Sequence, residues 1–92
     1  MMKILQTNNF TRKANRLTRK DESLRNKLRE VIFKLGRNPF DHSLFTHKLK
    51  GELEGKYSSR LTFDLRIIFK YVKENNEDRI LLLTIGSHDE VY

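Results

Sequence analysis

The hydrophobic pattern of this 92-residue chain changes at Asn38-Pro39. Before that point, apolar residues recur every three or four positions, which is the spacing of one face of a helix. Beyond it, short runs of β-branched and aromatic residues are separated by turn residues, which is typical of strands. Because proline interrupts a helix, the helical pattern cannot continue through Pro39. We therefore expect one α+β domain over residues 1–92.

The first half predicts a short strand followed by two helices. The strand is expected over residues 3–6, and Asn8 or Asn9 is expected to cap the first helix. Asp21 is the expected cap of the second helix, and Gly36 is expected to end it in a left-handed turn. Apolar residues on one side of these helices belong to the core: Phe10, Ala14, Leu17, Leu24, Leu28, Val31, Ile32 and Leu35.

The second half predicts four strands. The candidate segments are residues 45–49, 57–62, 65–72 and 80–85. The last is so apolar that it predicts a central strand covered on both faces and ended by Gly86. Gly51 and Gly55 bracket one turn, and residues 75–78 form another. This order predicts an N-terminal strand and helical hairpin on one face of a mostly antiparallel, four- to five-stranded sheet, whose other face is free for a ligand.

Composition excludes several classes of protein. Without cysteine the chain has no disulfides, no thiolate zinc site and no Cys nucleophile. We see no signal peptide and no apolar run long enough to cross a membrane, so we expect a cytoplasmic protein. There is no cluster of carboxylates and no Gly-rich phosphate loop, and His47 and His88 alone are too few for zinc. Neither a metal nor a cofactor is expected.

Positive charge is concentrated in the first half. The net charge is +7, and residues 1–50 hold 13 of the 19 Lys and Arg residues. Such a distribution indicates a polyanion or an acidic protein as partner. The alternative is a pair of solvated helices rich in Lys and Arg.

Polar residues occur near the ends of the strand candidates, where a sheet can bring them together: His47, Lys48, Lys50, Arg60, Asp64, Arg66, His88 and Tyr92. Imidazole and guanidinium are the groups that cleave RNA without metal. A base removes the proton of a 2′-hydroxyl, which attacks the neighbouring phosphate, while arginines stabilise the developing charge. An acid then protonates the leaving 5′-oxygen. Tyr92 is suited to stacking on a base.

The turn before Arg66 decides whether Arg60 and Arg66 can share a site. A two-residue turn at Phe63-Asp64 would place the two arginines on opposite faces of the sheet. A three-residue turn, or an equivalent bulge, would pair Arg60 with Ile68 and place both arginines on one face. We expect the odd-length turn.

Each of these residues also has a purely structural interpretation. A single histidine is most often a surface residue, and the arginines could pair with Asp64 or Glu90. Tyr92 could cover the edge of the sheet, and the lysines could be ordinary charges of an edge strand. We interpret Asp64 as a turn residue or an arginine partner rather than as a catalyst.

Three segments resemble one protein family. They are His47-Lys48-Leu49-Lys50-Gly51, residues 59–69 and residues 85–92. All three resemble toxins of the RelE/ParE superfamily, in particular its YafQ-like or YoeB-like branch, and Asn38-Pro39 also fits. The resemblance implies a sheet under two helices with the site on the concave face, and a toxin of a type II toxin–antitoxin system.

The resemblance also implies roles for residues. His47 falls where these toxins place a general base, Arg60 and Arg66 where they place phosphate-binding arginines, and His88 where they place the proton donor. Tyr92 falls where an aromatic residue closes the site. In this alignment, the general acid is His88, the probable base is His47, and Lys48 and Lys50 hold the RNA backbone.

The sequence departs from the family at two positions. Leu61 stands where YafQ-like enzymes have another histidine, and Asp64 is offset by one residue from their aspartate. RelE itself relies on lysines and arginines, so Lys48 or Lys50 remains an alternative to His47 as the base.

The resulting hypothesis is an endoribonuclease that cleaves mRNA in the ribosomal A site. Its expected partners are a cognate antitoxin in a hetero-oligomer, mRNA and ribosomal RNA, with no membrane. One alternative is a gyrase poison of the ParE type, which needs no proton donor at position 88. The other is an inactive module that binds RNA or antitoxin.

Overall fold

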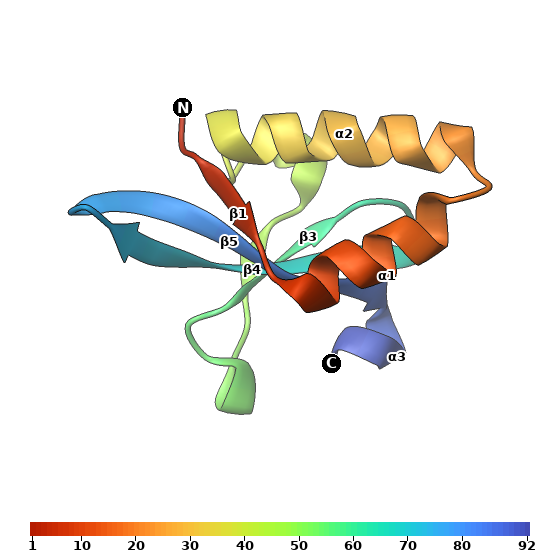
Figure 1. Ribbon diagram of the computed structural model, residues 1–92. Helices are drawn as coiled ribbons and strands as arrows, with labels where there is room; N and C mark the ends of the chain where they lie inside the picture. Colours follow the sequence, from red (N-terminus) through yellow and green to blue (C-terminus); the bar gives the residue numbers. More distant parts are fainter.

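The computed structural model describes residues 1–92 and contains a five-stranded sheet with two helices on one face (Figure 1). Its elements are β1 (Ile4–Gln6), α1 (Asn8–Thr18), α2 (Glu22–Arg37), η1 (His42–Leu44), β2 (His47–Lys48), η2 (Gly51–Leu53), β3 (Tyr57–Arg60), β4 (Leu65–Glu74), β5 (Glu77–Ser87) and α3 (His88–Val91). The strand order is β1-β5-β4-β3-β2, in which β1 is parallel to β5 and the other pairs are antiparallel. The expected α+β architecture is confirmed.

Side-chain oxygens begin both long helices. The Thr7 hydroxyl accepts a hydrogen bond from the Phe10 backbone N–H at 3.0 Å, so Thr7 caps α1. The expectation of Asn8 or Asn9 was wrong by one or two positions, since both already lie inside the helix. Asp21 caps α2 as expected, with its Oδ1 2.9 Å from the Leu24 nitrogen. Each cap satisfies a backbone N–H that has no partner within the helix.

Gly36 lies inside α2 and does not end it, contrary to expectation. The helix continues to Arg37 and stops where Asn38 becomes extended before a proline. Gly36 instead allows a close approach of the chain entering β1. Its carbonyl accepts the Met2 N–H at 2.8 Å, and a Cβ at Gly36 would lie 3.2 Å from the Met2 carbonyl oxygen.

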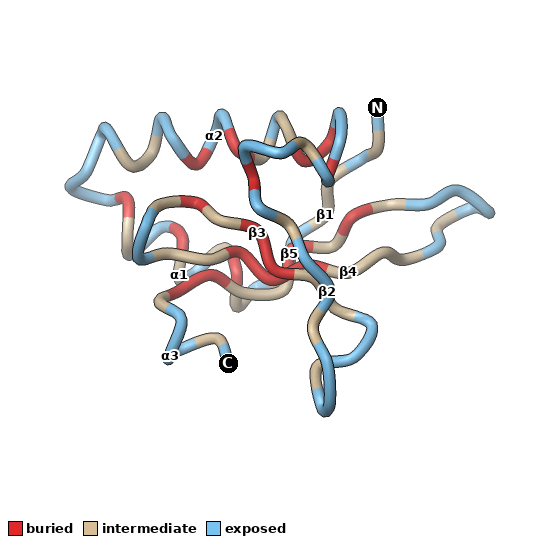
Figure 2. The backbone as a smooth tube through the Cα atoms, turned by 180° about the vertical axis from the view of Figure 1, so that it is seen from behind, coloured by how far each residue is buried: buried red, intermediate tan, exposed pale blue.

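The core lies between the two long helices and the sheet. It contains twelve buried residues: Phe10, Ala14, Leu28, Val31, Leu35, Leu44, Leu61, Ile67, Phe69, Ile80, Leu82 and Ile85. Leu17, Leu24 and Ile32 pack against it, so the predicted helix stripes are confirmed as core. Figure 2 shows the buried parts of β3, β4 and β5 meeting at the middle of the sheet.

β5 is an interior strand, but only one of its faces is fully covered. Ile80, Leu82 and Ile85 are buried, whereas Leu81 and Leu83 are half-buried. A bulge opposite Ile68/Phe69 shifts the register with β4, and the strand continues through Gly86 to Ser87. The expectation of a strand covered on both faces was therefore wrong, because α1 and α2 lie on one side of the sheet only.

The connections differ from expectation in length. Only His47–Lys48 of the predicted segment 45–49 forms a strand, and Phe45 adopts a left-handed conformation with φ 50°. β3 ends at Arg60, before the expected residue 62. Asn75 and Asn76 alone form the β4–β5 turn, both with positive φ, as two-residue hairpins require.

No helix is long and apolar enough to cross a membrane.

Candidate active site

A row of side chains crosses four strands on the face opposite the long helices. His47 on β2 lies opposite Ser58 on β3, Ser58 opposite Ile68 on β4, and Ile68 opposite Thr84 on β5. Residues directly opposite one another in a sheet point to the same side. Ile68 is buried but is not part of the main core, which agrees with its position on this second face. We call this surface the open face.

Arg60 and Arg66 belong to the next row of the open face. They lie directly opposite each other, and Arg66 lies opposite Gly86. Five residues, 61–65, separate the two paired arginines, and the two side chains share a face as predicted. The expected pairing of Arg60 with Ile68 was wrong, because the turn is two residues longer than the predicted one.

The C-terminal helix α3 folds across the open face, on the side of the sheet opposite α1 and α2 (Figure 1). A Cβ at Gly86 would lie 3.1 Å from Glu90 Oε1 and 3.3 Å from Val91 Cγ1, so glycine permits this close packing. Tyr92 then donates a hydrogen bond from its hydroxyl to the buried Ser58 hydroxyl. His88 and Tyr92 are thereby brought to the same surface as His47.

His88 packs edge-on against Tyr92, with ring centroids 4.4 Å apart. Its Nδ1 lies 3.6 Å from Asp89 Oδ1, but both side chains are largely exposed, so this ion pair is weak. His47 is exposed on the edge strand, and its Nδ1 lies 3.3 Å from the Phe45 carbonyl oxygen. Both imidazoles are accessible to a ligand lying on the open face.

Arg60 has no acidic partner. Its Cζ lies 4.2 Å from the centroid of the Phe45 ring, and its Nε is buried without a hydrogen-bond partner. A buried donor without a partner is uncommon in native proteins. The guanidinium therefore keeps its full positive charge, and no hydrogen bond or salt bridge of the protein occupies its terminal nitrogens.

Arg66 is held by the backbone of the turn that precedes it. Its Nη1 donates to the carbonyl oxygens of Thr62, Phe63 and Leu65 at 2.9, 3.0 and 3.2 Å. No carboxylate, including those of Asp64 and Glu90, forms a salt bridge with Arg60 or Arg66. The structural alternative for these arginines is therefore wrong, and Asp64 is simply an exposed turn residue.

A carboxylate fixes the start of α3. Glu90 Oε1 accepts the Ser87 backbone N–H at 2.8 Å. This hydrogen bond is the main reason that the pKa of Glu90 lies below its ordinary value, with a further contribution from the Ser87 side chain. The positive charges of Lys13 and Arg16 on α1 lower this pKa further. The negative charge of Glu90 therefore stabilises the helix that carries His88 and Tyr92.

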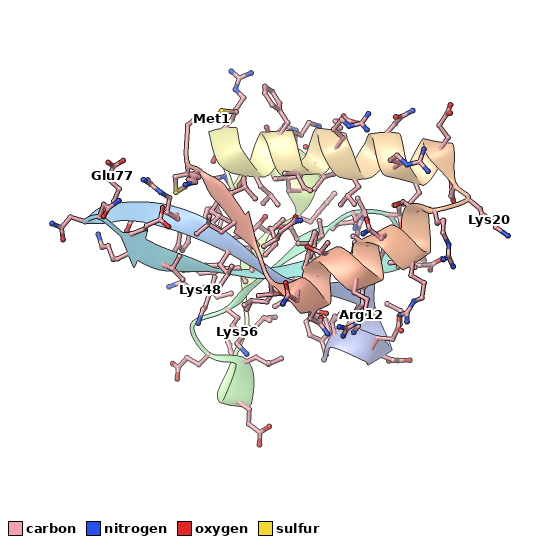
Figure 3. The ribbon with its side chains drawn as sticks, in the orientation of Figure 1. Met1, Arg12, Lys20, Lys48, Lys56 and Glu77 are labelled. Atoms are coloured by element: carbon pink, nitrogen blue, oxygen red, sulfur yellow. The ribbon has the colours of Figure 1, made fainter.

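Lys48 and Lys50 are placed away from the arginines. Lys48 lies opposite Tyr57 and points to the other side of the sheet from His47. Together with Lys56, the two lysines line a pocket of about 410 Å³ at the edge of the sheet. In Figure 3, Lys48 and Lys56 project from this edge, well apart from Lys20 at the link between α1 and α2. The lysines adjoin the open face without belonging to it.

Two residues of this surface were not found from the sequence. Ser58 is fully buried within a strand, and the available signal was a pair of adjacent serines, which is unusual in a buried strand. Phe45 lies two positions before His47, and nothing in the local pattern distinguishes it from a strand residue. Ser58 contacts Tyr92, and Phe45 contacts both Arg60 and His47, so both residues adjoin predicted site residues.

The open face thus combines two imidazoles with two guanidiniums and an aromatic ring. Imidazoles can accept and donate protons near neutral pH, and guanidiniums bind phosphate through several N–H groups. No group of three or more His, Asp or Glu side chains is arranged as metal ligands. Such a surface is chemically suited to an anionic substrate that undergoes proton transfer.

Comparison with known proteins agrees with this architecture. A YoeB/ParE toxin from Agrobacterium tumefaciens superposes with a TM-score of 0.80 at 24% identity, over 95% of this chain and 99% of that one. A metal-bound toxin from Helicobacter pylori gives 0.79 at 26% identity over the whole of both chains. YafQ in the E. coli DinJ–YafQ toxin–antitoxin complex gives 0.75 at 18%, over 99% and 97%. No curated protein sequence matches the chain.

A family model described as the bacterial toxin of type II toxin–antitoxin systems, YafQ, matches residues 2–92. The match includes β1, both long helices and the C-terminal segment that closes over the open face. The resemblance found in three segments of the sequence therefore extends over the whole fold. This chain belongs to the YafQ family of bacterial toxins of type II toxin–antitoxin systems.

Proposed function

We propose that this toxin is an endoribonuclease that cleaves mRNA in the ribosomal A site without using a metal ion. The observation that supports this most directly concerns one face of the sheet. Two imidazoles lie there together with two arginines, and neither arginine has an acidic partner. An acidic partner would neutralise a guanidinium, whereas a phosphate would take that place in the complex with RNA. We place the reaction in the cytoplasm, where the ribosome is.

In the proposed mechanism, His47 removes the proton of a 2′-hydroxyl, and the resulting oxygen attacks the adjacent phosphorus. The bond from phosphorus to the 5′-oxygen breaks, and His88 donates a proton to that oxygen as it leaves. Arg60 and Arg66 stabilise the extra negative charge on the phosphate during this step. Tyr92 stacks on a base of the extended RNA strand, a contact that does not depend on its sequence.

Two further groups of basic residues are assigned to binding. Lys48 and Lys50 hold the RNA backbone where the strand passes over the sheet edge beside His47. Lysine remains an alternative to His47 as the base. On the other side of the molecule, exposed residues of α1 and of the link to α2 contact ribosomal RNA: Arg12, Arg19 and Lys20.

We further propose that a cognate antitoxin silences this toxin in a hetero-oligomer. The E. coli neighbour YafQ is seen in a complex with DinJ, which supports a protein partner of the same kind here. The net charge of +7 favours an acidic antitoxin.

His88→Ala tests the proposed acid. We expect ribosome-dependent cleavage of mRNA to fall by about 10²- to 10⁴-fold, which is the usual contribution of one general acid or base. The matched control is His42→Ala, which removes an exposed histidine from η1, outside the open face. Cleavage is measured with purified toxin and programmed ribosomes, by mapping the cut RNA ends.

Other outcomes of this experiment identify the alternatives. Unchanged cleavage by His88→Ala would refute the acid role. Broken DNA with intact mRNA in cells that express the wild-type toxin would instead indicate a gyrase poison of the ParE type. If the wild-type toxin cuts no RNA where a related toxin does, the chain is a binding module.

A further inference from the structure

Phe45 has two unusual features. Its side chain is 59% exposed, although it is a large apolar residue, and its backbone is left-handed with φ 50° and ψ 40°. Residues other than glycine rarely adopt this conformation because the Cβ approaches the following carbonyl. Such a conformation persists only where the surrounding structure imposes it, and it is concentrated at functional sites. The left-handed residue ends η1, but the exposed ring is not explained by packing, because Phe45 is not part of the core.

The neighbours of Phe45 hold the segment firmly in place. Leu44 is buried in the core at 1% exposure, and the Phe45 N–H donates to the His42 carbonyl. On the other side, the Thr46 hydroxyl lies 2.6 Å from both the Pro39 carbonyl oxygen and the Ser59 hydroxyl. The chain is therefore anchored before and after Phe45, while the Phe45 ring itself projects outward.

The carbonyl of Phe45 contacts His47. The Phe45 oxygen lies 3.3 Å from His47 Nδ1, and a carbonyl oxygen can only accept a hydrogen bond. A hydrogen bond between these two atoms requires the proton to be on Nδ1. When the imidazole is neutral, the lone pair is then on Nε2, which is the form that can act as a general base.

The ring of Phe45 contacts Arg60. The Arg60 Cζ lies 4.2 Å from the ring centroid, within the range of a cation–π interaction. This contact orients the guanidinium without neutralising it and leaves its N–H groups free for phosphate. A carboxylate in the same place would have cancelled the charge on which phosphate binding depends.

We propose that Phe45 is a positioning residue for both His47 and Arg60, and that its left-handed backbone directs the carbonyl to one group and the ring to the other. The inference rests on the proposed function, because it assigns a purpose to two residues of that site. It does not require Phe45 to touch RNA.

Four substitutions separate the ring from the backbone. Phe45→Leu removes the aromatic face, and Phe45→Tyr retains it. Phe45→Gly also removes the ring, but glycine adopts the left-handed conformation readily, so the carbonyl stays in place. Phe45→Val disfavours that conformation, because a β-branched side chain is a genuine outlier there. The control is Phe33→Leu on α2, an exposed phenylalanine at 55% that also lies beneath an arginine, Arg37.

Cleavage of ribosome-bound mRNA measures the contribution of the ring. We expect Phe45→Leu and Phe45→Gly to lower kcat by roughly 3- to 30-fold, the range of a cation–π contact, with little change in KM. Phe45→Tyr and Phe33→Leu should stay within about twofold of the wild type. Equal kcat for the wild type and Phe45→Leu would overturn the contribution of the ring.

The ¹⁵N chemical shifts of the imidazoles measure the contribution of the carbonyl in the free toxin, without any activity assay. Above the titration range of histidine, we expect His47 to carry its proton on Nδ1 in the wild type and in Phe45→Gly. The exposed His42 serves as the internal reference. A His47 with its proton on Nε2 in the wild type would overturn the inference. If the wild type cleaves no mRNA, the proposed function fails, and the imidazole spectrum still decides the position of the His47 proton.

Discussion

Single atoms decide what the open face can bind. Arg60 and Arg66 lack acidic partners, and the buried Arg60 Nε has no hydrogen-bond partner. The only hydrogen bond that joins the C-terminal segment to the row of His47 is the one from Tyr92 to Ser58. Ser58 lies directly opposite His47, so its hydroxyl holds the ring of Tyr92, the residue after α3, beside the strand that pairs with the proposed base.

We expect Ser58→Ala and Tyr92→Phe to lower cleavage by about the same amount, roughly 3- to 10-fold each. Both changes remove the same hydrogen bond, so the double variant should be no worse than either single variant. The measurement is a double-mutant cycle on kcat/KM for ribosome-bound mRNA.

The control for this cycle is Thr18→Ala. Thr18 is buried on α1, on the other side of the sheet, and its hydroxyl donates to the Ala14 carbonyl at 2.9 Å. We expect this variant to lose stability and to retain cleavage. Independent, multiplicative losses in the Ser58 and Tyr92 variants would show that Ser58 does not act through Tyr92.

At the level of secondary structure, the position of α3 is decisive. The helix has only four residues, which is too short to be stable alone, so it depends on its docking against Gly86 and on the bond from Ser87 to Glu90. α1 contributes through the positive charges of Lys13 and Arg16. His88 and Tyr92 are therefore placed by contacts of the short helix with β5, β3 and α1, and not by the stability of the helix itself.

The lowered pKa of Glu90 predicts a dependence on pH. Because the pKa is lower in the folded protein than in the unfolded chain, ionised Glu90 stabilises α3 at pH values above its ordinary pKa. This stabilisation is lost as the pH falls through the lowered value. We expect the Ser87 amide resonance to shift with that titration as the bond weakens.

Two variants separate charge from hydrogen bonding in this titration. Glu90→Gln keeps an acceptor for the Ser87 N–H but has no carboxylate, so its amide resonance should not titrate in the acidic range. Glu90→Ala should show a frayed α3 at every pH. A Ser87 resonance that titrates equally in the wild type and in Glu90→Gln would assign the effect to Asp89 instead.

In the whole molecule, the proposed binding and catalytic residues lie on opposite sides of the sheet. One side of the sheet carries the long helices and most of the basic residues, and the other carries the candidate catalytic groups. The hairpin of β4 and β5 holds acidic residues that form ion pairs with Lys3, Lys73 and Arg79. On the two long helices and their link, only Lys27 and Lys34 form salt bridges, both with Glu30, so most of the positive charge there is unpaired.

We expect ribosome binding to weaken steeply with salt, because each phosphate contact releases a counterion. Replacing Arg12, Arg19 and Lys20 by glutamine should reduce the slope of log affinity against log salt by roughly 2. The measurement is ribosome pelleting or filter binding over a range of potassium chloride concentrations. Lys73→Gln, which removes a lysine already paired with Asp78, should leave the slope unchanged. Equal slopes for the triple variant and the wild type would show that this surface does not contact the ribosome.

Much of the architecture follows from neighbouring residues in the chain. The helix stripes, the caps at Asp21, the strands on either side of Asn75 and Asn76, and the basic first half all reflect local periodicity, propensity and charge. The candidate residues were proposed from the chemistry of imidazole and guanidinium and from the resemblance of three segments to a known family. The errors at Asn8, Asn9 and Gly36 concern helix ends, where several residues compete for the same role.

The assembly of the site required contacts between distant residues. The direct pairing of Arg60 with Arg66 depends on the length of a turn, and Ser58 meets Tyr92 across 34 positions. The left-handed Phe45 is imposed by anchors in the core and on β3. Local sequence carries no information about such contacts, because they are selected by burial and by hydrogen bonding in the folded chain.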